Sequence, residues 1–144
     1  MSTPCAVPPR ARLPWHKKVL PAAAAGVAAG LARLSPKSLR AVMEVVRRNA
    51  RAATAAEASA ARSAVVAVSL RCAVDGCLQR SIATALLCRV RGTWPTWCVG
   101  VRTIPFGAHA WVSVDGRMID EGVPDDTYRP LITIGPMPTH VEER

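Results

Sequence analysis

Two residues of this chain combine a reactive side chain with a position that would activate it. Cys77 follows Asp75-Gly76 and opens an apolar segment with helical periodicity, so its thiol is expected in the first turn of a helix. Unpaired N–H groups and the helix dipole stabilise a thiolate there and lower the pKa of the thiol. His109 begins an apolar run typical of a strand and can accept the thiol proton. The two residues together predict nucleophilic catalysis by a cysteine.

Strand register places a carboxylate beside this histidine. Asp115-Gly116 is typical of a two-residue hairpin turn, which fixes how the strand after it pairs with the strand before it. Because side chains alternate along a strand, Asp120 falls on the face of His109 and diagonal to it. A bulge that shifts the register by one residue would put Glu121 there instead. Asp120 is therefore predicted as the residue that orients His109, with Glu121 as the alternative.

The other cysteines and the histidines follow no metal-binding or disulfide pattern. The chain has five cysteines, an odd number, with no C-x-x-C and no histidines at zinc-ligand spacing. We therefore predict neither a metal nor a cofactor, and a cytoplasmic protein rather than a disulfide-stapled secreted one. Cys72, Cys88 and Cys98 lie in apolar stretches and are predicted to be core residues.

The elements that must hold the pair are helices first and strands afterwards, an order that indicates an α+β fold. Ser35-Pro36 and the pair Thr54 and Glu57 are helix-start signals. We predict helices at residues 16–33, 35 to 51, 54 to 72 and 77–91. Strands are predicted at residues 97–101, 109–114, 117–120 and 131–134.

By composition the chain divides into four stretches. They are a flexible Pro-rich arm at 1–15, a helical region at 16–72, a catalytic core at 73–135 and a loose tail at 136–144. Residues 19–32 follow two lysines and resemble the apolar part of a signal peptide. They are too short to cross a bilayer, which needs ~20 apolar residues. Because alanine is only weakly hydrophobic, the sequence favours a buried helix here.

Charge is distributed unevenly along the chain. Residues 1–100 hold 15 Lys and Arg against 3 Asp and Glu, a net +12, whereas residues 101–144 have a net charge of −3. The basic half indicates a surface for an acidic peptide, an acidic protein or nucleic acid, although an Arg-rich composition alone would give the same count. Nucleic acid is disfavoured because no recognised motif or interleaved aromatic pattern is present. We expect neither a nucleic-acid partner nor a membrane span.

Several short blocks of residues 65–131 resemble one family. They are Gly76-Cys77-Leu78-Gln79-Arg80-Ser81, Gly100-Val101-Arg102, Pro105-Phe106, His109-Ala110-Trp111-Val112 and Asp115-Gly116. Together they resemble the B2 proteins of lasso-peptide biosynthesis, which are similar to the core of transglutaminases and papain-like peptidases. The resemblance implies that a helix carrying the nucleophile packs on a small antiparallel sheet. It implies Cys77 as nucleophile and His109 as base, and its spacing puts the acid at Glu121 where the register puts it at Asp120.

The resemblance also implies a reaction. The Cys77 thiolate would attack the peptide bond between leader and core of a lasso-peptide precursor, and His109 would protonate the leaving amine and then activate water. Backbone N–H groups at the helix start would stabilise the oxyanion, whereas Gln79 is expected to point elsewhere. The chain would be a stand-alone peptidase that works with a PqqD-like leader-recognition protein and an asparagine-synthetase-like lasso cyclase.

Three other functions remain open from the sequence. The same Cys-His pair could serve an amide-transfer enzyme, in which only the acyl acceptor differs. The basic helices could form a binding protein for a partner or for nucleic acid. The fold could also be kept as an inactive scaffold, in which Cys77 would be unreactive.

Overall fold

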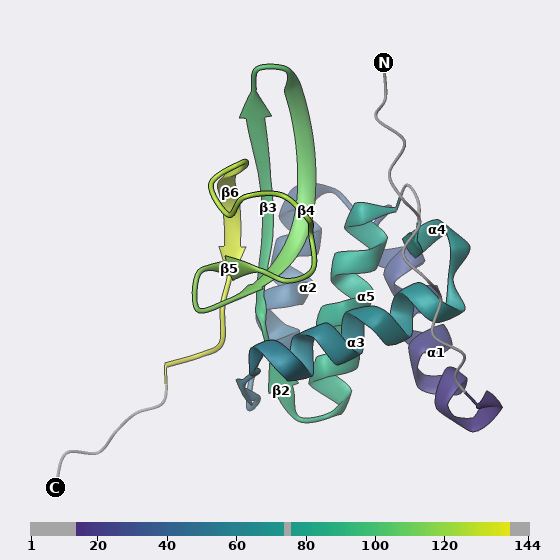
Figure 1. The fold of residues 1–144 in the computed structure, drawn as a ribbon. Helices are drawn as coiled ribbons and strands as arrows, with labels where there is room; N and C mark the ends of the chain where they lie inside the picture. The colour runs from purple at the N-terminus through teal and green to yellow at the C-terminus, as the bar shows by residue number, and fades with distance from the viewer. Residues whose placement is uncertain (1–13, 74–75, 139–144) are drawn as a thin grey trace, which may run out of the picture.

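The computed structural model describes residues 14–73 and 76–138, and it confirms an α+β fold (Figure 1). The helices are α1 (Trp15–Leu31), α2 (Pro36–Val46), α3 (Ala55–Val68), α4 (Leu70–Ala73) and α5 (Cys77–Val90). The strands are β1 (Arg51–Ala52), β2 (Thr93–Trp94), β3 (Thr96–Thr103), β4 (Phe106–Val114), β5 (Arg117–Met118) and β6 (Arg129–Ile134). Residues 1–13 of the predicted arm and residues 139–144 of the predicted tail lie outside the described residues.

Both predicted helix starts are present. The Ser35 hydroxyl accepts a hydrogen bond from the Ser38 N–H at the start of α2, and Thr54 forms a reciprocal capping box with Glu57 at the start of α3. The predicted ends were too late. Ser69 is extended (φ −130°, ψ 116°), so α3 ends at Val68 and α4 is a separate short helix. Helix α2 ends at Val46, a turn follows, and residues 51 and 52 form the short strand β1.

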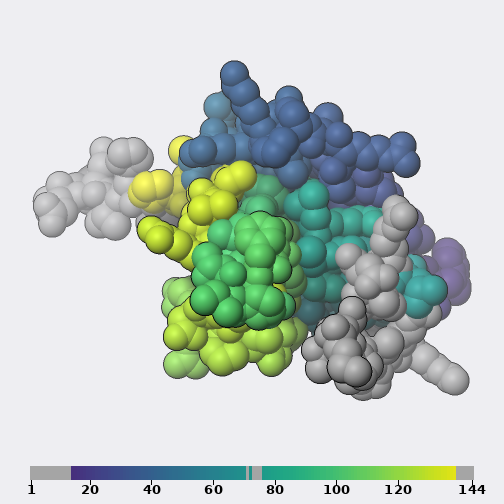
Figure 2. Space-filling view, turned by 90° about the horizontal axis from the view of Figure 1, so that it is seen from above, coloured from purple at the N-terminus to yellow at the C-terminus, as the bar shows by residue number. Residues whose placement is uncertain are grey.

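The main sheet is antiparallel, with strand order β5-β4-β3-β6. The predicted turn joins β4 to β5: Asp115 (φ 52°) and Gly116 (φ 77°) are both left-handed, as a type I′ turn requires, and Val114 pairs with Arg117. The parallel pair β1–β2 was not predicted, because two-residue strands leave no periodic pattern. Ile104 and Phe106, both exposed, lie at the tip of the β3–β4 hairpin. This hairpin is the green segment at the centre of Figure 2.

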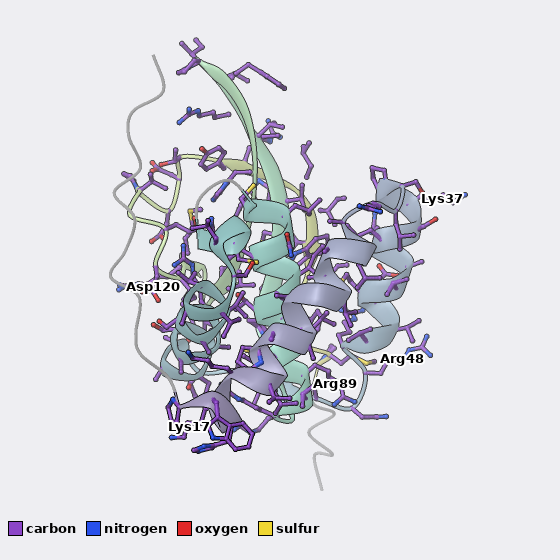
Figure 3. All side chains as sticks on the ribbon, turned by 90° about the vertical axis from the view of Figure 1, so that its right-hand side faces the viewer. Lys17, Lys37, Arg48, Arg89 and Asp120 are labelled. Atoms are coloured by element: carbon purple, nitrogen blue, oxygen red, sulfur yellow. The ribbon has the colours of Figure 1, made fainter. Side chains whose placement is uncertain are left out.

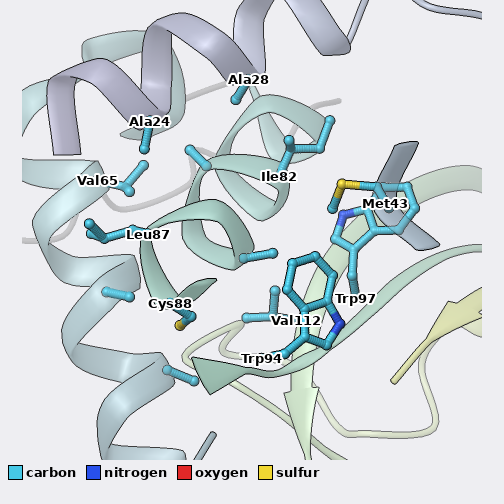
Figure 4. Packing of buried hydrophobic residues seen from close by; sticks show 14 of the residues in the cluster. Ala24, Ala28, Met43, Val65, Ile82, Leu87, Cys88, Trp94, Trp97 and Val112 are labelled. Carbon is cyan, nitrogen blue, oxygen red and sulfur yellow. The ribbon is translucent and has the colours of Figure 1, made fainter. Parts of the chain in front are cut away.

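Helix α5 lies at the centre of the molecule. It packs against α1 and α3 on one side and against β4 on the other (Figure 1). The core between the helices and the sheet holds the large side chains of Met43, Ile82, Trp94 and Trp97 (Figure 4). Trp94 and Trp97 each satisfy their N–H group: Trp94 donates to the carbonyl of Ile134 and Trp97 to the hydroxyl of Ser81. These bonds tie β6 to β2 and α5 to the start of β3.

The Ala-rich segment is a helix, as predicted, but only one of its faces is buried. Helix α1 buries Pro21, Ala24, Ala25 and Ala28, and the small alanine side chains let it lie close against α5. Within the described residues, no helix combines the length and apolar character needed to cross a membrane.

Gly100 permits a close approach that shapes the sheet beneath His109. It pairs with His109 across β3 and β4, and the β3–β6 register shifts beside it. A Cβ at this position would overlap the backbone carbonyl of Arg129 and would lie 2.9 Å from the Trp111 ring. Glycine is therefore required for β6 and Trp111 to lie where they do.

Candidate active site

The first residue of α5 meets the middle of β4. Here the Cys77 thiol lies within hydrogen-bond reach of the His109 imidazole and of the backbone N–H of Ala110. The structure thus brings the two sequence-predicted residues together, from elements 32 residues apart in the chain. Cys77 is partly exposed, whereas Cys72, Cys88 and Cys98 are buried in the apolar interior, as predicted.

The pair is electrostatically matched. Hydrogen bonding to His109 is the main reason that the pKa of Cys77 is lowered, and the Ala110 N–H and the charges of His109 and Arg80 add to it against the effect of burial. Burial alone would lower the pKa of His109, but the bonds to Cys77 and Glu121 and their charges outweigh it and raise this pKa to about 9. Both directions favour a thiolate–imidazolium pair near neutral pH.

Glu121, the alternative residue, is the carboxylate beside the histidine. Its Oε2 lies 2.7 Å from His109 Nε2, and its side chain is only 6% exposed. Nε2 is thus engaged by the carboxylate, which leaves Nδ1 to face the thiol. A protonated imidazole with both nitrogens bound in this way is held in one orientation.

The prediction of Asp120 at this position was wrong. Its carboxylate is exposed and instead accepts a hydrogen bond from the Ser59 hydroxyl at 2.5 Å. The predicted register holds as far as Ile119, whose N–H donates to the carbonyl of Val112. Asp120 (φ 53°) and Gly122 (φ 67°) then turn the chain away from the sheet. This turn brings Glu121 to His109.

Two arginines that the sequence reasoning did not assign to the site flank the Glu121 carboxylate. Arg62 of α3 and Arg80 of α5 each have a side-chain nitrogen 3.7 Å from a Glu121 oxygen, and their side chains are 14% and 10% exposed. Arg80 also donates to the carbonyl of Cys72 at 2.9 Å. The sequence did hold a signal for Arg80: a residue three positions after Cys77 lies on the same face of the helix.

Two aromatic rings pack beside the imidazole. Trp111, two residues along β4, stacks on it with ring centroids 6.0 Å apart and 14° between planes, and Tyr128 lies 4.9 Å away. The Arg102 guanidinium lies 5.5 Å from the Tyr128 ring. Tyr128 was missed because it stands in the irregular segment between β5 and β6, where no periodicity marks it. These rings restrict the imidazole and shield its bond to Glu121 from water.

The Gln79 amide is held away from the thiol. It donates to the carbonyl of Ala25 in α1 at 2.9 Å and is buried there. The expectation that it points away from the thiol is confirmed. The backbone N–H groups at the start of α5 have no partner within the helix and are the donors available to an oxyanion near the thiol.

A comparison with known families agrees with this geometry. The model of a family described as the Transglutaminase-like superfamily matches residues 21–133, which is more than half of the chain. The chain belongs to the transglutaminase-like superfamily. The match begins in α1, so the transglutaminase-like domain includes the helices as well as the sheet. Members of this superfamily are usually cysteine-dependent enzymes. Neither a curated protein nor a solved structure matches the chain significantly.

Replacing Arg80 with methionine should weaken both the fold and the site. The variant removes one of the two cations beside a buried carboxylate, so we expect the free energy of unfolding to fall by about 3 kcal/mol. It also removes a charge that lowers the pKa of Cys77, so half-maximal alkylation by iodoacetamide should move to higher pH. Denaturant melts and alkylation rates at graded pH measure the two effects.

Arg40→Met is the matched control for this variant. Arg40 pairs with Glu44 on the surface of α2, where the two side chains are 58% and 45% exposed, so its loss should cost under about 1 kcal/mol. It should leave the alkylation profile unchanged. An equal loss of unfolding free energy in the two variants would contradict a role for Arg80 in holding Glu121.

Proposed function

We propose that this chain is a cysteine peptidase that cuts a peptide bond through a thioester on Cys77. The observation that carries the proposal is the 2.7 Å bond between His109 and the buried Glu121, on an imidazole that also contacts the thiol. This order of thiol, imidazole and carboxylate is the arrangement that activates a cysteine nucleophile. The lowered pKa of Cys77 and the raised pKa of His109 support it.

The reaction proceeds in two acyl transfers. The Cys77 thiolate attacks the scissile carbonyl, and N–H groups at the start of α5 stabilise the oxyanion. Protonated His109 gives its proton to the leaving amine, so the peptide C–N bond breaks and an acyl thioester remains. Neutral His109 then takes a proton from water, whose oxygen attacks the thioester and releases the carboxylate product. Glu121 orients the imidazole throughout.

The substrate class we propose is a leader–core precursor of the lasso type. Support comes from the sequence blocks around Cys77 and His109, which resemble the lasso B2 proteins. The chain would act in the cytoplasm with a PqqD-like leader-recognition protein and supply the freed core to an asparagine-synthetase-like cyclase. The net +12 of residues 1–100 provides a surface for such partners or for an acidic leader.

Amide transfer is the second candidate, and membership of the transglutaminase-like superfamily favours it. The thioester on Cys77 would then be attacked by an amine instead of water. The two reactions differ only in the acceptor of the acyl group, which is the oxygen of water in hydrolysis and the nitrogen of an amine in amide transfer.

One experiment separates these functions. A precursor peptide is incubated with this protein and its recognition partner in water enriched in ¹⁸O, and the products are mapped by mass spectrometry. We expect one cut at the end of the leader, with one ¹⁸O in the new carboxyl group. A product that carries an added amine would instead establish amide transfer. An uncut precursor, with a cognate partner present, would overturn the peptidase proposal.

A further inference from the structure

A cavity opens beside the nucleophile on the side of α1. It has a volume of about 400 Å³. Residues of two helices and their flanks line it: Ala29, Ala32, Arg33, Gly76, Cys77, Leu78 and Gln79. The hydrogen-bond partners of the thiol come from β4, whereas this cavity is bounded by the end of α1. Cys77 therefore lies between its base and an open space that a substrate can enter.

The position of the base decides which part of a substrate would lie in this space. His109 protonates the leaving amine in the proposed reaction, so the leaving peptide lies on the His109 side of the thiol. The acyl part of the substrate then extends to the other side, toward α1. For a leader–core precursor, the acyl part is the end of the leader.

The walls of the cavity define the side chain that fits. Ala29, Ala32 and Leu78 offer small or apolar surface, and the Gln79 amide is already bonded to the carbonyl of Ala25. Among the described residues that line the cavity, Arg33 is the one basic side chain and none is a carboxylate. A side chain with an apolar stem and an anionic end complements such walls.

We propose that this cavity is the acyl-side subsite and that Arg33 binds an acidic side chain there, within three residues of the scissile bond. Glutamate fits best, because its methylene groups can lie against the alanines while its carboxylate reaches the guanidinium. Since Arg33 is exposed, the preference is moderate, about fivefold over the neutral amide. This subsite rests on the proposed function, because it assumes that Cys77 forms the acyl enzyme.

The test uses peptide electrophiles that trap Cys77 without turnover. Each is a short N-acetylated peptide ending in a vinyl sulfone, with Glu, Gln or Lys placed first, second or third from the electrophile. Intact-mass spectrometry gives the labelling rate of wild type, Arg33→Glu and Arg48→Glu. Arg48→Glu makes the same change in net charge at a different place. Arg33 precedes the start of α2, where Lys37 lies, and Figure 3 shows Arg48 at the opposite end of that helix.

In one positional series, wild type should react about fivefold faster with the Glu probe than with the Gln probe, and slowest with the Lys probe. Arg33→Glu should reverse this order, and Arg48→Glu should keep it. The subsite is overturned if no series shows a preference, or if Arg33→Glu keeps the wild-type order.

A small reagent separates failure of the subsite from failure of the peptidase. Iodoacetamide should alkylate Cys77 in all three proteins, and each protein's probe rates are divided by its own iodoacetamide rate, so that any change in thiol reactivity caused by reversing a nearby charge cancels. If iodoacetamide alkylates Cys77 rapidly but the labelling rates of the probes do not depend on Arg33, the subsite alone is overturned. Cys77 no more reactive than the buried Cys88 would overturn the proposed function itself.

Discussion

Cys77→Ala is expected to reduce precursor cleavage to background, a loss on the order of 10⁵-fold or more. The thiolate forms the only covalent bond between enzyme and substrate in the proposed reaction, and alanine cannot replace it. Single-turnover mass spectrometry of the precursor measures the loss. The trapped thioester, seen as a leader-mass adduct in wild type, should disappear as well.

Cys98→Ser is the control for this variant. Cys98 is buried beside the Ser113 hydroxyl, and burial raises the pKa of its thiol, so it should contribute nothing to the reaction. Cleavage by this variant should match wild type once the folded fraction is taken into account. Activity retained by Cys77→Ala would move the nucleophile elsewhere and disprove the proposed role of the thiol.

Glu121→Gln should lower kcat on the order of 10²- to 10⁴-fold. Glutamine keeps the size of the side chain but removes the charge that stabilises the imidazolium and fixes its orientation. Asp120→Asn is the matched control, because Asp120 is the adjacent carboxylate and contacts Ser59 instead of the imidazole. It should retain cleavage within about threefold. A larger loss for Asp120→Asn than for Glu121→Gln would reverse this assignment.

The pH profile of kcat/KM gives a second measure of Glu121. Activity needs the thiolate and the protonated imidazole together, so it rises through the lowered pKa of Cys77 and falls through the raised pKa of His109, about 9. Glu121 raises the pKa of His109. Its loss should therefore move the alkaline limb to lower pH and narrow the active range from that side.

This shift separates an electrostatic effect from unfolding. Glu121→Gln leaves Arg62 and Arg80 beside a neutral amide, so some loss of stability is also expected. Partial unfolding would scale the profile down without moving its limbs. A fall in kcat with an unmoved alkaline limb would mean that Glu121 acts only on the fold.

Local signals in the sequence were sufficient for most of the fold. Capping residues marked the starts of α2 and α3, and Asp115-Gly116 fixed the β4–β5 turn, because each acts through bonds to its near neighbours. The breaks at Val46 and Val68 escaped prediction. They depend on contacts with distant residues: β1 follows α2 because residues 51 and 52 pair with Thr93 and Trp94, which lie 42 positions away.

The residues of the candidate site divide in the same way, into those marked by local signals and those placed by contacts with distant residues. Cys77 could be predicted because a helix start leaves a local pattern, and His109 because it stands in an apolar strand pattern, although β4 begins three residues before it, at Phe106. The choice between Asp120 and Glu121 depended on where β5 leaves the sheet, and a non-glycine residue at φ 53° has no reliable sequence signal. Arg62 entered the site only through the packing of α3, which no spacing rule reveals.

The three groups of the site come from a helix, a strand and a turn that follow one another along the chain. During synthesis Cys77 leaves the ribosome first, His109 follows 32 residues later and Glu121 another 12 residues later. Until that last turn has formed, the imidazole lacks the carboxylate that raises its pKa, and the thiol lacks a fixed base. A nascent or truncated chain that lacks this turn would therefore lack the proposed activity, which would arise only as the sheet closes over the helix.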